Sequence, residues 1–218
     1  MGMKPPRTPY EEWLALDEKV RAEFIDGKIM MLDAPSDAVT LPSPSGAHQY
    51  VQGELGDFVR ALVRSHADCP NGWWILCDYD VRLGENVLRP DLVGWRRERS
   101  PRLPERPVEL RPDWACEIVS PSNTNHDRVT KRRLYAEHGV PHYWVIDPME
   151  RTLEALALCD GTWTEIGVYD EEDVARIAPF DAVELEIGRL FVPREEEDGE
   201  SGEDDGQREE VASSAVVG

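Results

Sequence analysis

The sequence predicts an α/β fold whose core runs in the order helix, three strands, helix, strand. Residues 47–63 carry apolar side chains mostly three and four positions apart, which is typical of an amphipathic helix. Three β-rich runs follow this helix. A strand, a helix and another strand then occupy residues 114–147, and such a unit predicts a right-handed crossover between parallel strands.

The N-terminal segment predicts a short helix and a hairpin in front of this core. Thr8, Pro9 and Glu11 form a capping-box start, so we expect a helix to about Leu16. The runs AEFI and KIMML flank Asp26-Gly27, a pair suited to a type I′ turn because both residues need positive φ.

The core strands and the second core helix follow from changes in hydrophobic period. WWILCDYDVRL and NVLRPDLVGW predict two strands, and DWACEIV predicts a third. A helix over residues 125–138 should end at Gly139, before the strand HYWVIDP. We therefore expect a mixed central sheet flanked by helices, with strands 114–119 and 142–147 parallel.

The last part of the body predicts an antiparallel C-terminal extension. TLEALAL and TWTEIGVY flank Asp160-Gly161, and a final strand pair is expected near VELEIGRLFVP.

Acidic charge is concentrated at the C-terminus. The 218 residues contain 44 acidic and 24 basic side chains, a net charge of −20. Residues 194–218 hold ten acids and two arginines, which leaves −12 on residues 1–193. We expect one domain over 1–193 and a disordered acidic tail over 194–218. This balance excludes a protein that coats polyanions without specificity.

The chain lacks the sequence marks of a secreted or membrane protein. Its cysteines form no C-x-x-C pair, and no apolar run approaches the length of a membrane span. Residues 1–7 begin no apolar signal segment. These features favour a cytoplasmic protein with reduced thiols and no membrane partner.

Two acids fall in segments that are otherwise apolar. Asp91 follows Pro90, and Glu117 lies inside Trp114–Val119. Buried carboxylates are costly unless an ion or a donor compensates them, so acids on adjacent strands suggest a shared Mg²⁺ or Mn²⁺. A solvent-facing or capping role is the alternative for each acid taken alone.

The helix after Glu117 carries Asp127, Lys131 and Tyr135 at helical spacing. Lys131 is thus able to face the two carboxylates. The spacing alone favours a structural role over a catalytic one: Asp127 caps the helix or forms a surface ion pair with Lys131.

Several segments together resemble one protein family. These are Pro90-Asp91, EIVSPS beginning at Glu117, HDRVTKRRLY and GVPHYWVIDP. The chain resembles the bacterial putative restriction endonuclease family of the PD-(D/E)XK nuclease superfamily over about residues 10–192. The FIDGKI hairpin and His48, which opens the long helix, belong to the resemblance.

The resemblance implies a restriction-endonuclease-like core and a Mg²⁺- or Mn²⁺-dependent endonuclease. Asp91, Glu117 and the carbonyl of Ile118 would hold the metal. The superfamily lysine normally stands two residues after the acid, where this chain has Val119. Lys131 is the candidate replacement for that catalytic amine.

Four further residues are weaker candidates for the site. Glu23 and His48 would line the pocket, and Asp127 and Tyr135 would orient Lys131. A purely structural role is the alternative for each of them. The remaining histidines give no metal-binding motif: His66, His126, His138 and His142.

DNA is the expected substrate, with a basic segment as its guide. Six arginines lie between Arg96 and Arg111, and Arg96, Arg97 and Arg99 directly follow the strand that Asp91 begins. Arg132 belongs to a second small basic cluster on the later helix. A solvated loop is the alternative reading of the first segment. A homodimer is considered because many nucleases of this fold pair two sites on two strands.

Two other functions remain open at this point. The displaced lysine and the acidic net charge are also consistent with a nuclease fold of weak or no activity that binds or regulates a partner. A metal-assisted hydrolase of smaller phosphoesters would use the same site without a basic groove.

Overall fold

The computed structural model describes residues 6–32, 46–65, 72–119 and 126–194, without the side chains of residues 62–65 and 127. The elements in chain order are α1 (Pro9–Leu14), β1 (Ala22–Ile25), β2 (Lys28–Met31), α2 (Gly46–Ser65), β3 (Trp73–Cys77), β4 (Val81–Leu83), β5 (Asn86–Leu88), β6 (Leu92–Arg96), β7 (Trp114–Ile118), the π-helical turn η1 (His126–Lys131), α3 (Arg132–Glu137), β8 (His142–Asp147), β9 (Thr152–Cys159), β10 (Thr162–Asp170), β11 (Val174–Ala175), β12 (Leu185–Glu186) and the 3₁₀ turn η2 (Ile187–Leu190).

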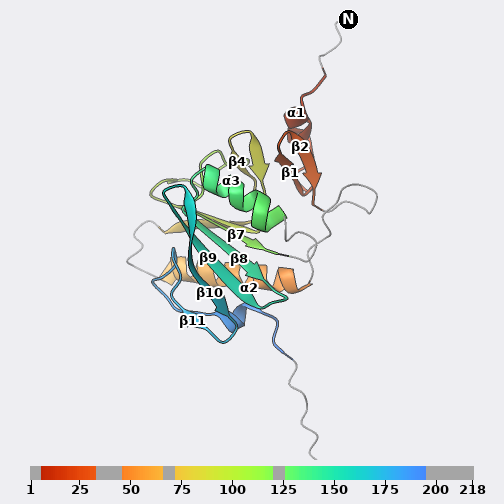
Figure 1. Cartoon of the computed structure of the whole chain (residues 1–218). Helices are drawn as coiled ribbons and strands as arrows, with labels where there is room; N and C mark the ends of the chain where they lie inside the picture. Colours follow the sequence, from red (N-terminus) through yellow and green to blue (C-terminus); the bar gives the residue numbers. More distant parts are fainter. Residues whose placement is uncertain (1–5, 33–45, 66–71, 120–125, 195–218) are drawn as a thin grey trace, which may run out of the picture.

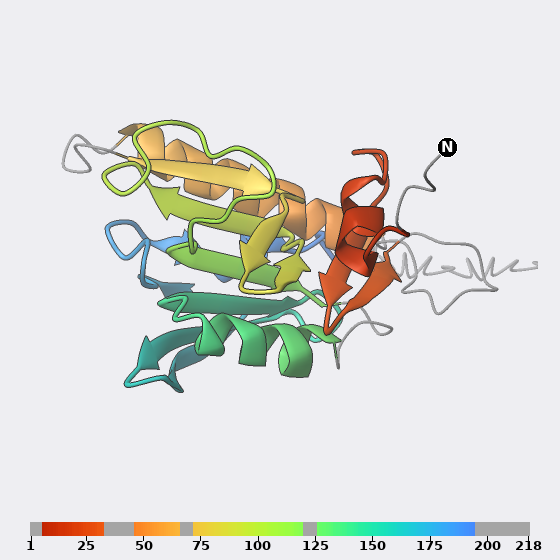
Figure 2. The ribbon, with the colours of Figure 1, turned by 90° about the horizontal axis from the view of Figure 1, so that it is seen from above.

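A six-stranded sheet of order β10-β9-β8-β7-β6-β3 forms the centre of the molecule. β7 and β8 are parallel, and the other neighbours pair antiparallel. Helix α2 covers one face and α3 covers the other (Figures 1 and 2). The α/β class, the core order α2-β3-β6-β7-α3-β8 and the parallel crossover are therefore as predicted.

Each face of this sheet has its own apolar core. Val51, Leu55 and Val59 of α2 pack with Trp114 and Trp144 on one face. Leu134 and Tyr135 of α3 pack with Val93, Ala115 and Val145 on the other. Alternating strand residues thus bury both faces, as expected for a sheet covered by helices on both sides.

The turn chemistry predicted from the sequence is present. Thr8 and Glu11 form a reciprocal capping box at α1. Asp26-Gly27 and Asp160-Gly161 have φ values of 49° and 77°, and of 50° and 76°, respectively. These positive values allow the tight β1–β2 and β9–β10 hairpins predicted from the sequence, and the β9–β10 pairing shifts register between Glu165 and Gly167.

A second sheet of order β2-β1-β5-β4 differs from the prediction. Each of the two long runs between residues 73 and 95 was expected to be one strand, but each is divided between the two sheets. The first run bends at Asp78, which has φ 49°. The second is interrupted at Pro90, whose ring removes a backbone donor.

The helix predicted at 125–138 begins, within the described residues, as the π turn η1 and continues as α3. It ends before Gly139, whose φ is 73°.

The predicted final strand pair is only partly correct. Leu185–Glu186 pairs with Val174–Ala175, and the following Ile187–Leu190 forms a 3₁₀ turn instead of a strand. Ile187 and Leu190 are both buried, and a 3₁₀ turn places residues three apart on the same side.

Residues 195–218, nearly all of the predicted acidic tail, lie outside the described residues, so the domain boundary stays a prediction. In the part of the chain that is described, no helix is both long and apolar enough to cross a membrane. Cys77, Cys116 and Cys159 are free thiols, and burial raises the pKa of Cys116 well above its usual range.

Candidate functional site

The two predicted metal-binding acids meet at one end of the central sheet. Leu92 of β6 pairs with Cys116 of β7, and continuing this antiparallel register by one residue places Asp91 opposite Glu117. Asp91 Oδ2 accepts a hydrogen bond of 2.7 Å from the backbone N–H of Ile118. Asp91 is 7% exposed and Glu117 is fully buried. Neither acid faces solvent, so the solvent-facing alternative does not apply to them.

Lys131 points at this pair from the end of η1. Its Nζ lies 2.9 Å from Glu117 Oε2 and 3.0 Å from Glu23 Oε1, and the side chain is 5% exposed. The ammonium also donates to the carbonyl of Arg89 at 3.4 Å. A surface ion pair with Asp127 was the favoured reading of the spacing, and Lys131 is instead buried between two other acids. The side chain of Asp127 lies outside the described atoms.

Glu23 reaches the site from the small second sheet. Its Oε1 accepts from the backbone N–H of Arg89 at 2.8 Å, and its Oε2 lies 2.7 Å from His126 Nε2. Burial alone would raise the pKa of Glu23, but the Lys131 charge and the His126 hydrogen bond outweigh it and lower the pKa. Glu23 is therefore an ionised partner of Lys131.

His126 was set aside in the sequence analysis and nevertheless contacts Glu23. No sequence motif marks this pairing, because 103 positions separate the two residues and the contact depends on how the two sheets meet.

Tyr135 binds the other oxygen of Glu117. Its hydroxyl donates to Glu117 Oε1 at 2.7 Å. Burial raises the pKa of Tyr135 well above its usual range, and the nearby Glu117 charge acts in the same direction. The phenol therefore stays protonated and remains a donor to the carboxylate.

The start of α2 supports Asp91 from the opposite face of the sheet. His48 Nε2 lies 3.1 Å from Asp91 Oδ1. One helical turn later, Gln52 donates to the carbonyl of Asp91 at 2.9 Å and to Asp78 Oδ2 at 3.0 Å. Gln52 and Asp78 were missed, although the spacing of four between His48 and Gln52 is a helical signal that could have identified the first of them.

The donor chemistry of this sheet end fits a hard divalent cation. Carboxylate oxygens have about two acceptor positions each, so oxygens that already accept one hydrogen bond can still coordinate a cation. Mg²⁺ is commonly bound through one or two carboxylates together with waters and substrate oxygens. Across the described ranges, no group of three or more His, Cys, Asp or Glu side chains is arranged as a complete metal site. Asp91 and Glu117 supply the carboxylate oxygens that such a site needs.

Three of the four arginines predicted to bind DNA, Arg96, Arg97 and Arg99, do not lie at this end. Arg96 is five residues from Asp91 along β6, a strand rise of roughly 17 Å, and lies at the opposite end of the sheet. Arg96 and Arg97 stack on Trp73 and Trp74 at 4.9 and 4.0 Å, and Arg99 pairs with Asp113. Their role in DNA binding stays a prediction.

A second basic group lies closer to the carboxylates. Arg132 is 3.1 Å from Glu154, and Arg128 lies 3.4 Å from both Asp147 and Glu154. Asp147 ends β8, which is parallel to β7, so this group lies at the same sheet end as Glu117. Arg128 is a candidate that the sequence analysis did not select.

Comparisons with known proteins agree with this architecture. A solved structure titled as a putative nuclease belonging to DUF820 from Anabaena variabilis is similar with a TM-score of 0.63 and 24% identity, covering 85% of this chain and 97% of that one. No curated protein sequence matches. The model of the Uma2 family, described as "Putative restriction endonuclease", matches residues 8–188. Because the matched residues make up most of this chain, the chain belongs to the Uma2 family.

Proposed function

We propose that this chain is a Mg²⁺- or Mn²⁺-dependent endonuclease that hydrolyses phosphodiester bonds of DNA. Membership of the Uma2 family supports a nuclease in general terms. The observation that carries the specific proposal is the contact of Lys131 with Glu117 beside Asp91, which brings an amine and two acids from three separate elements to one sheet end.

The charge of the site supports a cation. Among the described side chains, Glu23, Asp91 and Glu117 are buried carboxylates, and Lys131 is the buried ammonium that lies between two of them. These four side chains alone carry a formal charge of −2. A bound divalent ion would balance that charge, and buried charges generally require such compensation.

Asp91, Glu117 and the carbonyl of Ile118 would hold the metal. When bound, the ion would neutralise the scissile phosphate and lower the pKa of a coordinated water. The protein's own groups fix these ligands: the Ile118 N–H and His48 orient Asp91, and the Tyr135 hydroxyl orients Glu117. Ligands with such second partners hold their geometry before substrate arrives.

Lys131 would provide the positive charge near the reacting phosphate. Its position between Glu23 and Glu117 favours the protonated amine, so we assign it electrostatic stabilisation of the developing negative charge. This geometry also favours catalysis over a purely binding role, because only a lysine directed toward the acids can act on a phosphate bound there.

Nicking of supercoiled plasmid tests the proposal. Wild type should cut with Mg²⁺ or Mn²⁺ and not with EDTA, and Asp91→Asn, Glu117→Gln and Lys131→Met should each lower the rate by at least about 100-fold. Asp113→Asn is the matched control, because Asp113 is equally buried but lies at the other end of the sheet near Arg96. Folded wild type that cuts neither plasmid nor short duplexes would refute the proposal.

A further inference from the structure

Two crossings connect the small sheet to the central sheet. The chain leaves β3 for β4 through residues 78–80, and it returns from β5 to β6 through residues 89–91. Asp80 lies on the first crossing and Arg89 on the second. Their side chains form a bidentate ion pair, with Arg89 Nε 2.6 Å from Asp80 Oδ1 and Nη2 3.1 Å from Oδ2.

This ion pair is enclosed and holds a third segment. Both side chains are 4% exposed. Arg89 Nη1 also donates to the carbonyl of Val20, just before β1, at 3.2 Å. The Arg89 side chain therefore fixes the two crossings and the strand that carries Glu23 relative to one another.

The peptide groups of Arg89 contact the charged site itself. Its N–H donates to Glu23 Oε1 at 2.8 Å, and its carbonyl accepts from Lys131 Nζ at 3.4 Å. Asp91 follows only two residues later. Any shift of the Arg89 backbone would therefore move the carboxylate that holds Lys131 and one acceptor of its ammonium.

We propose that Arg89 is a positioning residue for Lys131, locked in place by Asp80. The inference rests on the proposed nuclease function and adds to it a residue that acts through its backbone. Misplacing a catalytic group by about 1 Å can cost on the order of 100-fold in rate, so a rigid support for the ammonium has a direct catalytic consequence.

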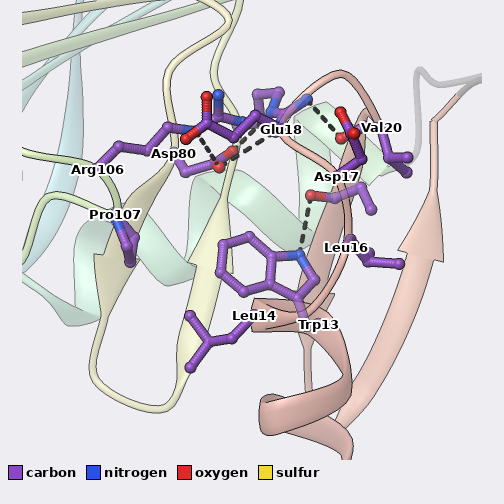
Figure 3. Close-up of a pocket in the computed structure, with 11 residues that line it drawn as sticks. Trp13, Leu14, Leu16, Asp17, Glu18, Val20, Asp80, Arg106 and Pro107 are labelled. Carbon is purple, nitrogen blue, oxygen red and sulfur yellow. Dashed lines mark hydrogen bonds and ion pairs between the residues drawn. The ribbon is translucent and has the colours of Figure 1, made fainter.

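Arg106 provides a matched control on the same carboxylate. Its Nε also donates to Asp80, but its side chain is 25% exposed and packs over the Tyr79 ring. Asp80, Arg106 and Trp13 lie around a cavity, seen in Figure 3, that Arg89 also lines and whose volume is about 140 Å³. The peptide N–H of Arg89, in contrast, donates directly to Glu23.

The first test observes the Lys131 ammonium directly. The sequence has only four lysines, and Lys19 and Lys28 are exposed, so NMR of ¹⁵N-labelled protein can identify the buried ammonium by its loss in Lys131→Met. In Arg89→Lys, which cannot form the bidentate pair, hydrogen exchange of this ammonium should become at least about tenfold faster. Arg106→Lys should leave it unchanged. An unchanged signal in Arg89→Lys, or an equal change in both variants, would overturn the proposal.

The second test separates positioning from general loosening. In plasmid nicking, Arg89→Lys should lower kcat by about 10- to 100-fold while KM and Mn²⁺ affinity stay close to wild type. The loss should disappear in a Lys131→Met background, and an additive loss there would contradict a role through Lys131. If Arg89→Lys does not fold, Asp80→Asn carries the same expectations. If folded wild type does not nick, the nuclease proposal fails, while the ammonium signal still decides the positioning role.

Discussion

Replacing Lys131 by Met should destabilise this protein much more than replacing an exposed lysine. The ammonium lies 2.9 Å from Glu117 and 3.0 Å from Glu23, and all three side chains are at most 5% exposed. Methionine preserves most of the side-chain volume and removes the charge. Two buried carboxylates then lose their shared cation, which is the most costly way to break a buried ion pair.

The expected loss is about 3 to 5 kcal/mol of unfolding free energy, the range for an uncompensated buried charge. For a domain of this size that corresponds to a decrease in Tm of roughly 10 °C. A surface pair between Asp127 and Lys131 would instead contribute only about 0.3 to 0.5 kcal/mol. A buried Lys131 and a Lys131 paired with Asp127 on the surface therefore predict losses of unfolding free energy that differ several-fold.

Urea unfolding followed by the fluorescence of the seven tryptophans gives this quantity. Lys28→Met is the control, because Lys28 is exposed at the end of β2. A Lys131→Met loss within about 0.5 kcal/mol of the control, the range of ordinary surface substitutions, would refute the buried arrangement. Adding Glu23→Gln should cost less in the Lys131→Met background than in wild type, with a coupling of about 1 to 3 kcal/mol.

The other predictions concern acid, salt and packing. Because the folded-state pKa of Glu23 lies below its ordinary value of 4.5, its ionised form stabilises the fold above that pH. The stability gap between wild type and Glu23→Gln should therefore be full at pH 7 and should close as pH falls below about 4.5 in matched urea titrations. For DNA binding, Arg128→Gln should reduce the slope of log affinity against log salt by about one, as expected for one lost phosphate contact. Equal slopes for wild type and Arg128→Gln would exclude Arg128 from the interface. Gly94→Ala should lower the unfolding free energy by about 1 to 3 kcal/mol, because its Cβ would lie 2.9 Å from Ile75 Cδ1 and 3.1 Å from the Trp73 ring; calorimetric unfolding measures this loss.

Local sequence signals predicted most of the elements because their causes are local. The α1 capping box, the Asp26-Gly27 turn and the end of α3 at Gly139 depend on a few adjacent residues. The division of the two long strand-like runs is marked locally at Asp78 and Pro90, but these residues do not specify the new strand partners. The division also depends on pairing between β1 and β5, where Phe24 faces Val87 from 63 positions away.

Among the site residues, too, those with a local sequence signal were predicted and those that depend on long-range contacts were missed. Asp91 and Glu117 were selected because a charge inside an apolar run is unusual, and the structure brings both to one sheet end. His126 and Arg89 carry no such signal, since a histidine in a polar helix start and an arginine beside proline are common. The His126–Glu23 contact exists because η1 lies against the small sheet, and Arg89 reaches Glu23 because β5 pairs with β1.

The same geometry is consistent with a catalytic amine at Lys131, as proposed above, instead of at the usual superfamily position. Val119, where the superfamily lysine usually stands, follows Glu117 by two residues and packs in the core beneath α3. Lys131 approaches that same face from η1, so both positions can direct a side chain toward Glu117. An amine arriving from η1 leaves Val119 free to pack, but it must itself be held by groups outside the sheet. Glu23 and the Arg89 carbonyl supply that support. Under the proposed function the small second sheet would serve the site, because it carries Glu23, the counter-charge of Lys131.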